Sequence, residues 1–237
     1  FTNYRRRVCE KIMGIRRFQN HPIIKEFNGL KKFFRGHETT VSRNRINDFK
    51  RFVALIESSG DTIAFDLMGS VNFGQATEHS DTDVVMYLNC DPGRIGDCDH
   101  ENCTRLNLYK NLLINTLVYE YSNNTYPVQV VDCINLAQLD YDLKIRNFNS
   151  LALIKFGFYR SICRGINRKL LYQYEQRLEE DSELCDVIES SLADCFLGLI
   201  HSSQHSYSFK KYIERVQDGG FKVPETMANK INSYLSF

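Results

Sequence analysis

The chain has 237 residues, 43% of them hydrophobic, and a formal net charge of +1, so it can bury one large hydrophobic core or two smaller ones. No apolar stretch approaches the about 20 residues that a membrane-spanning helix needs, so we expect no membrane contact. The basic residues at the start of the chain, FTNYRRRVCEKIMG, are not followed by an apolar segment. We therefore expect no secretion signal and a cytoplasmic protein.

Charge is distributed unevenly along the chain. Residues 1–51 contain 14 Lys and Arg against 4 Asp and Glu, which leaves 16 against 25 in the remainder. Such asymmetry is typical of a surface that binds RNA or DNA, and it fits equally well with basic side chains that pair with acidic residues elsewhere in the chain. On the first interpretation one basic face forms from Arg5, Arg6, Arg7, Arg16, Arg17, Lys31, Lys32 and Arg35.

Apolar residues near the N-terminus recur every three or four positions and predict amphipathic helices. One helix is expected before Pro22 and another after it, to about Phe34. The residues from Gly36 to Ser42 read as a loop, and Ser42 is expected to cap a third helix that runs to about Ser59. The turn residues Ser-Ser-Gly-Asp then lead into the first strand.

The most informative stretch is residues 63–88, IAFDLMGSVNFGQATEHSDTDVVMYL, in which two apolar segments, predicted as strands, flank a polar connection. Asp81 and Asp83 stand two positions apart at the head of the second strand, where side chains i and i+2 point the same way. Two carboxylates this close are expected to raise a pKa unless a cation lies between them. Mg²⁺, which prefers oxygen ligands, is the simplest candidate.

Gly69 and Ser70 follow the first of these two strands. A glycine allows close backbone approach, and a helix that begins there presents free N–H groups to an anion. The sequence therefore predicts a phosphate-binding position at Gly69 and Ser70, next to a metal-binding pair of carboxylates.

These residues form a signature that resembles that of the DNA polymerase beta-like nucleotidyltransferase superfamily: Gly69-Ser70-x-x-x-Gly74-x-Ala76-x-x-x-Ser80-Asp81-x-Asp83. The resemblance covers residues 65–136. It implies a metal-dependent enzyme that transfers a nucleoside monophosphate from a nucleoside triphosphate to a hydroxyl group and releases pyrophosphate. The acceptor could be a nucleotide, an RNA end, a small molecule or a protein.

A third carboxylate lies on a later strand in this family. The apolar run PVQVVDCINL, residues 127–136, carries Asp132 in its middle. The resemblance implies that two Mg²⁺ or Mn²⁺ ions bind here, one held by Asp81 and Asp83 and one shared by all three carboxylates. The alternative is a catalytically silent module that binds a nucleotide, a nucleic acid or a partner protein, although such a module has no physical need for three converging carboxylates.

Eight cysteines are present, and they are dense only in CDPGRIGDCDHENC, residues 90–103. This stretch offers Cys90, Cys98, His100 and Cys103, which are enough ligands for one tetrahedral zinc ion. It lacks the paired C-x-x-C motifs of typical zinc sites, so a polar loop between a strand and the next helix remains the other interpretation.

The remaining elements complete an α+β fold, a small mixed sheet with helices on one face followed by a C-terminal helical bundle. A helix is expected over residues 106–122, and beyond Asn149 no strand is expected. Five helices are predicted over residues 150–165, 168–180, 183–201, 206–216 and 224–235. Residues 1–149 are thus a predicted nucleotidyltransferase domain and residues 150–237 a helical domain. In larger members of the family such a domain forms the far wall of the nucleotide cleft, where candidate contacts are Lys155, Tyr159, Arg160, Lys169, Lys210 and Lys211.

Overall fold

The structure, a computed structural model, describes residues 15–90, 94–113, 126–201 and 203–236. Its centre is a mixed sheet with the strand order β3-β2-β1-β4. The strands are β1 (Ile63–Leu67), β2 (Thr82–Leu88), β3 (Val128–Asn135) and β4 (Arg164–Gly165). β1 runs antiparallel to β2 and β4, whereas β2 and β3 are parallel. The α+β class predicted from the sequence is confirmed.

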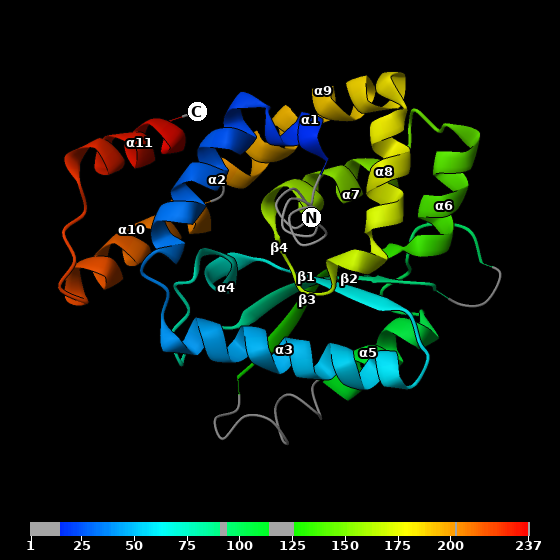
Figure 1. Ribbon diagram of the computed structural model, residues 1–237, viewed down its shortest axis with the longest axis horizontal. Coiled ribbons are helices and arrows are strands. Elements are labelled where there is room, and N and C mark those ends of the chain that lie inside the picture. Colours follow the sequence, from blue (N-terminus) through cyan, green and yellow to red (C-terminus); the bar gives the residue numbers. More distant parts are fainter. Residues whose placement is uncertain (1–14, 91–93, 114–125, 202, 237) are drawn as a thin grey trace, which may run out of the picture.

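Helices cover both faces of the sheet, where the sequence had suggested one (Figure 1). One face packs on α3 (Thr40–Ser58) and α5 (Thr104–Leu113). Phe65 of β1 meets the rings of Phe49 and Phe52 of α3, with centroids 5.7 and 5.8 Å away. β1 and nearly all of β2 are buried, which is why these strands read as continuous apolar runs and not as alternating ones.

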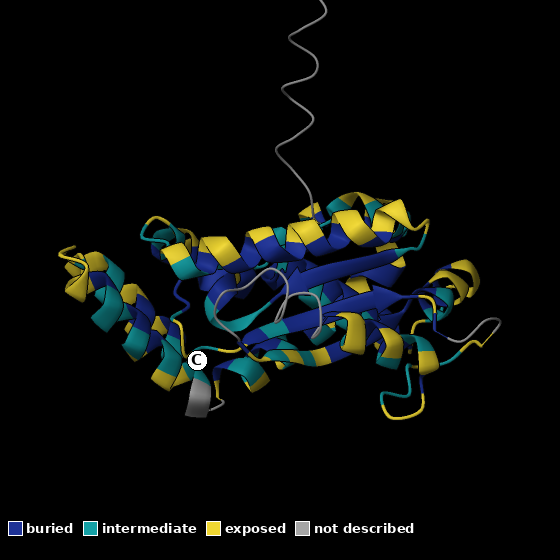
Figure 2. Cartoon of the chain, turned by 90° about the horizontal axis from the view of Figure 1, so that it is seen from below, coloured by how far each residue is buried: buried dark blue, intermediate teal, exposed yellow. Residues whose placement is uncertain are grey.

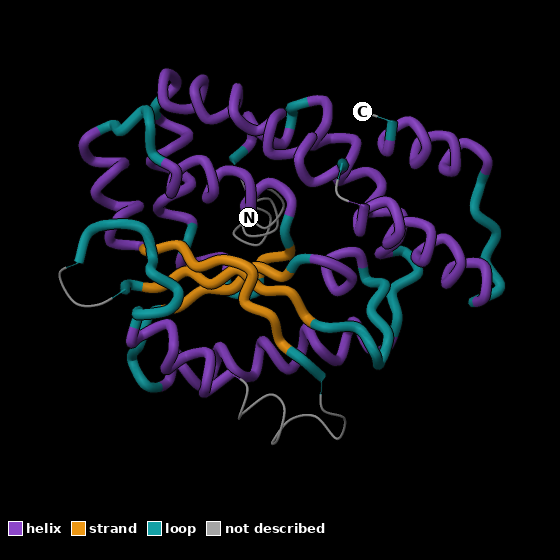
Figure 3. The backbone as a smooth tube through the Cα atoms, turned by 180° about the vertical axis from the view of Figure 1, so that it is seen from behind, coloured by secondary structure: helices purple, strands orange, loops and turns teal. Residues whose placement is uncertain are grey.

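The other face is covered by α2 (Pro22–Arg35), α6 (Leu136–Ile145) and α7 (Leu151–Ile162), with α1 (Arg16–Gln19), α8 (Tyr172–Glu180) and α9 (Ser182–Ile200) packed around them. Figure 3 shows the sheet between these two layers of helices. The strands are buried between helices whose outer surfaces are exposed (Figure 2). No helix in the described ranges combines the length and the apolar character needed to cross a membrane.

A cluster of aromatic rings joins the N-terminal helices to the C-terminal ones. Phe34 of α2 lies 6.0 Å from Phe73 of α4 (Gly69–Phe73) and 5.8 Å from Phe209 of α10 (Ser203–Asp218), measured between ring centroids. Tyr234 of α11 (Glu225–Leu235) meets Phe27 and Phe209 in the same way. The ring cluster therefore contains residues from both sides of the predicted domain boundary between residues 149 and 150. The boundary itself stays a prediction.

Several local details differ from the sequence prediction. Thr39, and not Ser42, caps α3, because its hydroxyl accepts the N–H of Ser42 at 3.1 Å. β4 and α6 were not predicted, since a two-residue strand shows no periodicity and the start of α6 continues the apolar run of β3. A short 3₁₀ helix, Arg168–Leu170, precedes α8. The part of the predicted 106–122 helix beyond residue 113 lies outside the described residues.

Candidate active site

The turn after β1 brings Gly69 against Asp83. The backbone N–H of Met68 donates to the carbonyl of Asp83 at 2.9 Å, and Gly69 then adopts a positive φ of 55°. A Cβ atom on Gly69 would lie 2.1 Å from Asp83 Oδ2. A glycine is thus required twice, for its backbone conformation and for the room that the carboxylate occupies.

Replacing Gly69 by alanine should disturb this site directly. We expect Gly69→Ala to displace the Asp83 carboxylate and to lower the free energy of unfolding by about 1–3 kcal/mol, as a strained backbone does. Urea unfolding measures the loss. Gly29→Ala is the matched control, because a Cβ there meets nothing within 4 Å and alanine within a helix gains about 0.5–1 kcal/mol. Equal stability of the two variants would contradict the close contact between Gly69 and Asp83.

Arg45 of α3 holds the segment that leads to Asp81. Its guanidinium donates to the carbonyls of Asp81 and Thr77, both at 3.0 Å, and to Thr82 Oγ1 at 3.2 Å. It also lies over the ring of Tyr126, 4.4 Å from the centroid. These bonds use the backbone of Asp81 and leave its carboxylate exposed to solvent. Nothing in the sequence pattern distinguished Arg45 from the surface charges of an amphipathic helix.

The surroundings of Asp83 raise the pKa of its carboxyl group. Burial, and after it the charge of Asp81, raises the pKa of Asp83 to about 6. An ionised Asp83 is costly in the absence of a cation, because burial and the charge of Asp81 both disfavour its charged form. A bound divalent cation would remove this cost. For the same reason a cation between Asp81 and Asp83 was predicted from the sequence.

A hollow of about 490 Å³ opens in front of the two carboxylates, a size within the usual range of small-molecule sites. Its first wall comes from the sheet and the turn after β1, and its second from α10. The residues of these walls that bear on the chemistry are Gly69, Ser70, Asp81, Asp83 and Gln129 on the first, and Tyr207, Lys211, Tyr212 and Arg215 on the second.

The α10 wall carries the cations. Lys211 Nζ lies 3.4 Å from a carboxylate oxygen of Glu214, an exposed pair that leaves the ammonium accessible, and Arg215 donates to the carbonyl of Gln75. Burial raises the pKa of Tyr212 to about 12, and the charge of Asp83 makes a smaller contribution in the same direction. Acidic side chains at the start of β2 and basic side chains of α10 therefore line one hollow. The sequence suggested Lys211 among several candidates and did not suggest Arg215.

Asp132 lies on the same face of the sheet as Asp83 but farther along the strands. A bulge in β3 places Gln129 opposite Asp83 and Asp132 opposite Val85, with Val131 as the extra residue. Two residues along a strand correspond to about 7 Å. The hollow is accordingly lined by Gln129 and Val131, and Asp132 is absent from its lining.

The Asp132 carboxylate is buried and bonded to its neighbours. Its Oδ2 accepts the hydroxyl of Tyr159 at 2.9 Å and lies 3.1 Å from Lys155 Nζ, while its Oδ1 lies 3.4 Å from His100 Nε2. Lys155 and Tyr159, suggested from the sequence as nucleotide contacts, thus both contact this carboxylate, and their contact with a nucleotide stays a prediction. The role of Asp132 as a third metal ligand stays a prediction. In that role its carboxylate would have to release the ion pair with Lys155.

Three of the four predicted zinc ligands lie together. The Sγ atoms of Cys90, Cys98 and Cys103 are within 4.8 Å of one another, and this group could hold a metal ion. His100 does not join them, because its ring is turned to Asp132. The predicted ligand set is thus corrected at one position.

Three basic residues of the N-terminal segment, Arg17, Lys31 and Arg35, make contacts within the chain, and residues 1–14 lie outside the described part. Burial, and next the charge of Arg35, lowers the pKa of Lys31 to about 7. Their contacts are those of Arg17 with Asp186 and Glu189, of Lys31 with the carbonyl of Ile162, and of Arg35 with Asn72. Arg17 therefore pairs with acidic residues, as the second interpretation expects, whereas Lys31 and Arg35 donate to uncharged groups inside the protein.

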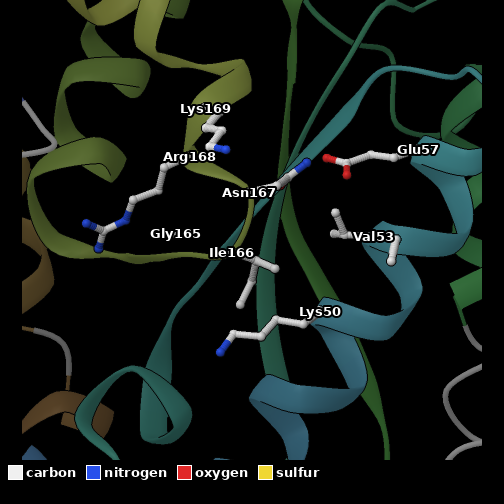
Figure 4. Close-up of a pocket in the computed structure, with 9 residues that line it drawn as sticks. Lys50, Val53, Glu57, Gly165, Ile166, Asn167, Arg168 and Lys169 are labelled. Atoms are coloured by element: carbon white, nitrogen blue, oxygen red, sulfur yellow. The ribbon is translucent and has the colours of Figure 1, made fainter. Parts of the chain in front are cut away.

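A second hollow, of about 520 Å³, lies between α3 and the segment after β4 (Figure 4). Lys50, Val53 and Glu57 line it from α3, and Asn167 and Lys169 line it from the opposite side. The side chain of Asn167 is hydrogen bonded to the edge of β1, because its Oδ1 accepts the N–H of Phe65 at 3.1 Å. The hollow offers one carboxylate and no converging pair, so the Asp81 and Asp83 site is the stronger candidate for metal chemistry.

Comparison of the chain with known family models, with curated proteins and with solved structures gives no match. The assignment of function therefore rests on the residues and the geometry above.

Proposed function

We propose that the protein is a Mg²⁺-dependent nucleotidyltransferase that works in the cytoplasm. One observation supports this above the others: Asp81 and Asp83 line the same hollow as Lys211 and Arg215. A triphosphate bound to a divalent cation needs both kinds of group, carboxylates for the cation and cations for the phosphate oxygens.

Each wall has a distinct role in this proposal. Asp81 and Asp83 would hold the metal, and the chemistry that it would supply there is polarisation of the phosphoryl group and neutralisation of charge. Ser70 and the α10 cations bind the outer phosphates. Asp132 acts as the third ligand once the acceptor hydroxyl arrives, and its carboxylate then helps to remove the hydroxyl proton.

The acceptor follows less directly from the site. Arg17, Lys31 and Arg35 are committed to contacts inside the protein, which reduces the charge left for a long RNA or DNA. A nucleotide, a small molecule, a protein side chain or a short RNA end is therefore favoured as the acceptor. RNA or DNA binding through the basic N-terminal segment would weaken steeply as salt increases, because each neutralised phosphate releases counterions.

A second candidate is a module that binds a nucleotide and catalyses nothing. The ion pair between Asp132 and Lys155 favours it, together with the neutral Gln129 opposite Asp83, where a third carboxylate would be closest to the pair. Nucleotide binding that is independent of metal, measured by calorimetry, would support this alternative.

Thermal melting tests the proposed site without any choice of acceptor. ATP with Mg²⁺ at a hundredfold excess over the dissociation constant should stabilise the fold by about 2.7 kcal/mol, or about 5–11 °C, and either ligand alone should do much less. Because the pKa of Asp83 is about 6, this shift should be full at pH 7–8 and shrink below pH 6 as the carboxylate takes up a proton. Ionisation of Asp83 also costs stability as the pH rises from about 4 past 6, so Asp83→Asn should melt higher than wild type at pH 8 without ligand.

Glu78→Gln is the matched control, since Glu78 is an exposed acid three residues before Asp81 and its loss removes the same charge. This variant should keep the joint effect of ATP and Mg²⁺, and Asp83→Asn should lose it. Equal stabilisation of Asp83→Asn and wild type would remove the metal-bridged nucleotide from the proposal. Melts with the four nucleotides would also rank the donors.

A further inference from the structure

The cysteine group at the end of β2 gains a member from β3. The thiol of Cys133 lies next to those of Cys90 and Cys98. Cys98 in turn is hydrogen bonded to Cys103. Cys98 thus has the other three thiols as neighbours, and Cys133 stands beside the three cysteines whose Sγ atoms all lie within 4.8 Å of one another. All cysteines in the described part of the chain are free.

The spacing of these sulfur atoms fits a single metal ion. Zinc binds four thiolates at about 2.3 Å in a tetrahedron, which places the sulfur atoms about 3.8 Å apart. The Sγ atoms of Cys90, Cys98 and Cys103 already lie within 4.8 Å of one another. An iron–sulfur cluster would hold its cysteines farther apart, because several iron atoms lie between them.

The surrounding structure holds the ligands from outside the group. Asn135, which caps α6, accepts the N–H of Cys90 at 3.2 Å and donates to the carbonyls of Arg94 and Gly96 at 3.2 and 2.9 Å. The backbone N–H of Leu106 points to Cys103 Sγ at 3.4 Å. N–H groups directed at sulfur and a fixed ligand loop are what thiolate sites use to orient and stabilise their ligands.

We propose that Cys90, Cys98, Cys103 and Cys133 bind one structural Zn²⁺ through four thiolates. Four Zn–S bonds form, and the thiol protons pass to solvent. The ion would join the end of β2, the loop before α5 and the middle of β3. It would thereby hold a loop whose described part contains no helix or strand. Cys90, Cys103 and Cys133 are buried, which leaves no open position for a substrate and marks the site as structural.

The proposed ion lies next to the candidate active site in the chain. Asp132 precedes Cys133, and its Oδ1 accepts the N–H of that residue at 2.8 Å. His100, between Cys98 and Cys103, contacts the same carboxylate. Zinc would therefore fix both the strand and the loop that position Asp132, independently of the reaction that Asp132 serves.

Metal content tests the site directly. The full chain, purified under reducing conditions and loaded with Zn²⁺, should hold one ion per chain by mass spectrometry, and Co²⁺ in its place should give sulfur-to-cobalt charge-transfer absorption. We expect Cys133→Ser and Cys98→Ser to weaken zinc binding at least about 100-fold in competition with a chelator, more than the loss of an outer hydrogen-bond partner costs. Cys98 is only half-buried, so its variant separates a lost ligand from a failure to fold.

Two variants serve as controls. His100→Ala and Cys195→Ser, the second at a half-buried thiol outside the group, should keep one zinc per chain. Zinc retained by Cys133→Ser and lost by His100→Ala would overturn the four-cysteine site, because His100 and not Cys133 would then be the fourth ligand. Reduced wild type that binds no zinc, that carries iron and sulfide, or that forms a disulfide between these cysteines by mass would overturn the proposal.

Discussion

Replacing Asp83 by asparagine is expected to lower the rate of nucleotide transfer by at least about 10³-fold, and Asp81→Asn should have a similar effect. Asparagine keeps the size of the side chain and removes the charge that holds the metal, so electrostatic stabilisation of the transition state is lost while the fold remains. Pyrophosphate release from labelled ATP, CTP, GTP and UTP, with Mg²⁺ or Mn²⁺ and each class of acceptor, measures the rate.

Glu78→Gln, which removes an exposed acid near the site, should leave the rate unchanged. Asp132→Asn then separates two roles for Asp132. If Asp132 binds the metal directly, the variant should lower the transfer rate as much as Asp83→Asn does. If Asp132 only anchors Lys155 and Tyr159, the rate should fall far less. Undiminished turnover in Asp83→Asn would refute the site assignment. No pyrophosphate release from wild type that binds metal would favour the silent module.

The buried ion pairs around Arg160 predict the largest effect on stability. Arg160 donates to Asp66 Oδ1 at 2.5 Å and to Glu175 Oε1 at 2.6 Å, and the hydroxyl of Tyr87 donates to Asp66 Oδ2 at 2.7 Å. All of these side chains are buried. Asp66→Ala leaves a guanidinium inside the protein with one carboxylate fewer, so we expect unfolding by urea to show a loss of about 3–5 kcal/mol.

Asp140→Ala provides the comparison, because Asp140 pairs with Arg177 at the surface. Removal of an exposed pair costs at most about 1 kcal/mol. If Asp66→Ala costs no more than Asp140→Ala, the buried pairs contribute little to the fold.

The features that could be predicted from the sequence are local ones. Asp81 and Asp83 need only the alternation of a strand to point the same way, and a glycine directly after β1 indicated a close approach that the structure places at Asp83. The three longer strands likewise follow from short apolar runs bounded by turn residues, and the C-terminal helices from the helical spacing of their own apolar residues.

What could not be predicted depends on contacts between distant residues. Arg45 and Arg215 reach the site from helices whose charged positions look alike in sequence. A bulge in β3 shifts Asp132 by one residue against β2, and no residue type marks such a bulge. Cys133 reads as a small apolar residue of a strand until the fold brings it to Cys90.

The edge strand β4 has a consequence for the order in which the chain assembles. Gly165 pairs with Asp66, and the N–H of Ile166 donates to the carbonyl of Phe65 at 2.9 Å, about a hundred residues apart in sequence. During synthesis β2 can cover one edge of β1 early, whereas the other edge stays open and Asp66 lacks Arg160. That edge can pair with another chain until residues 160–167 emerge. Completion of the sheet is therefore a late step. It is also a slow step, because the pairing of β4 with β1 closes a long loop.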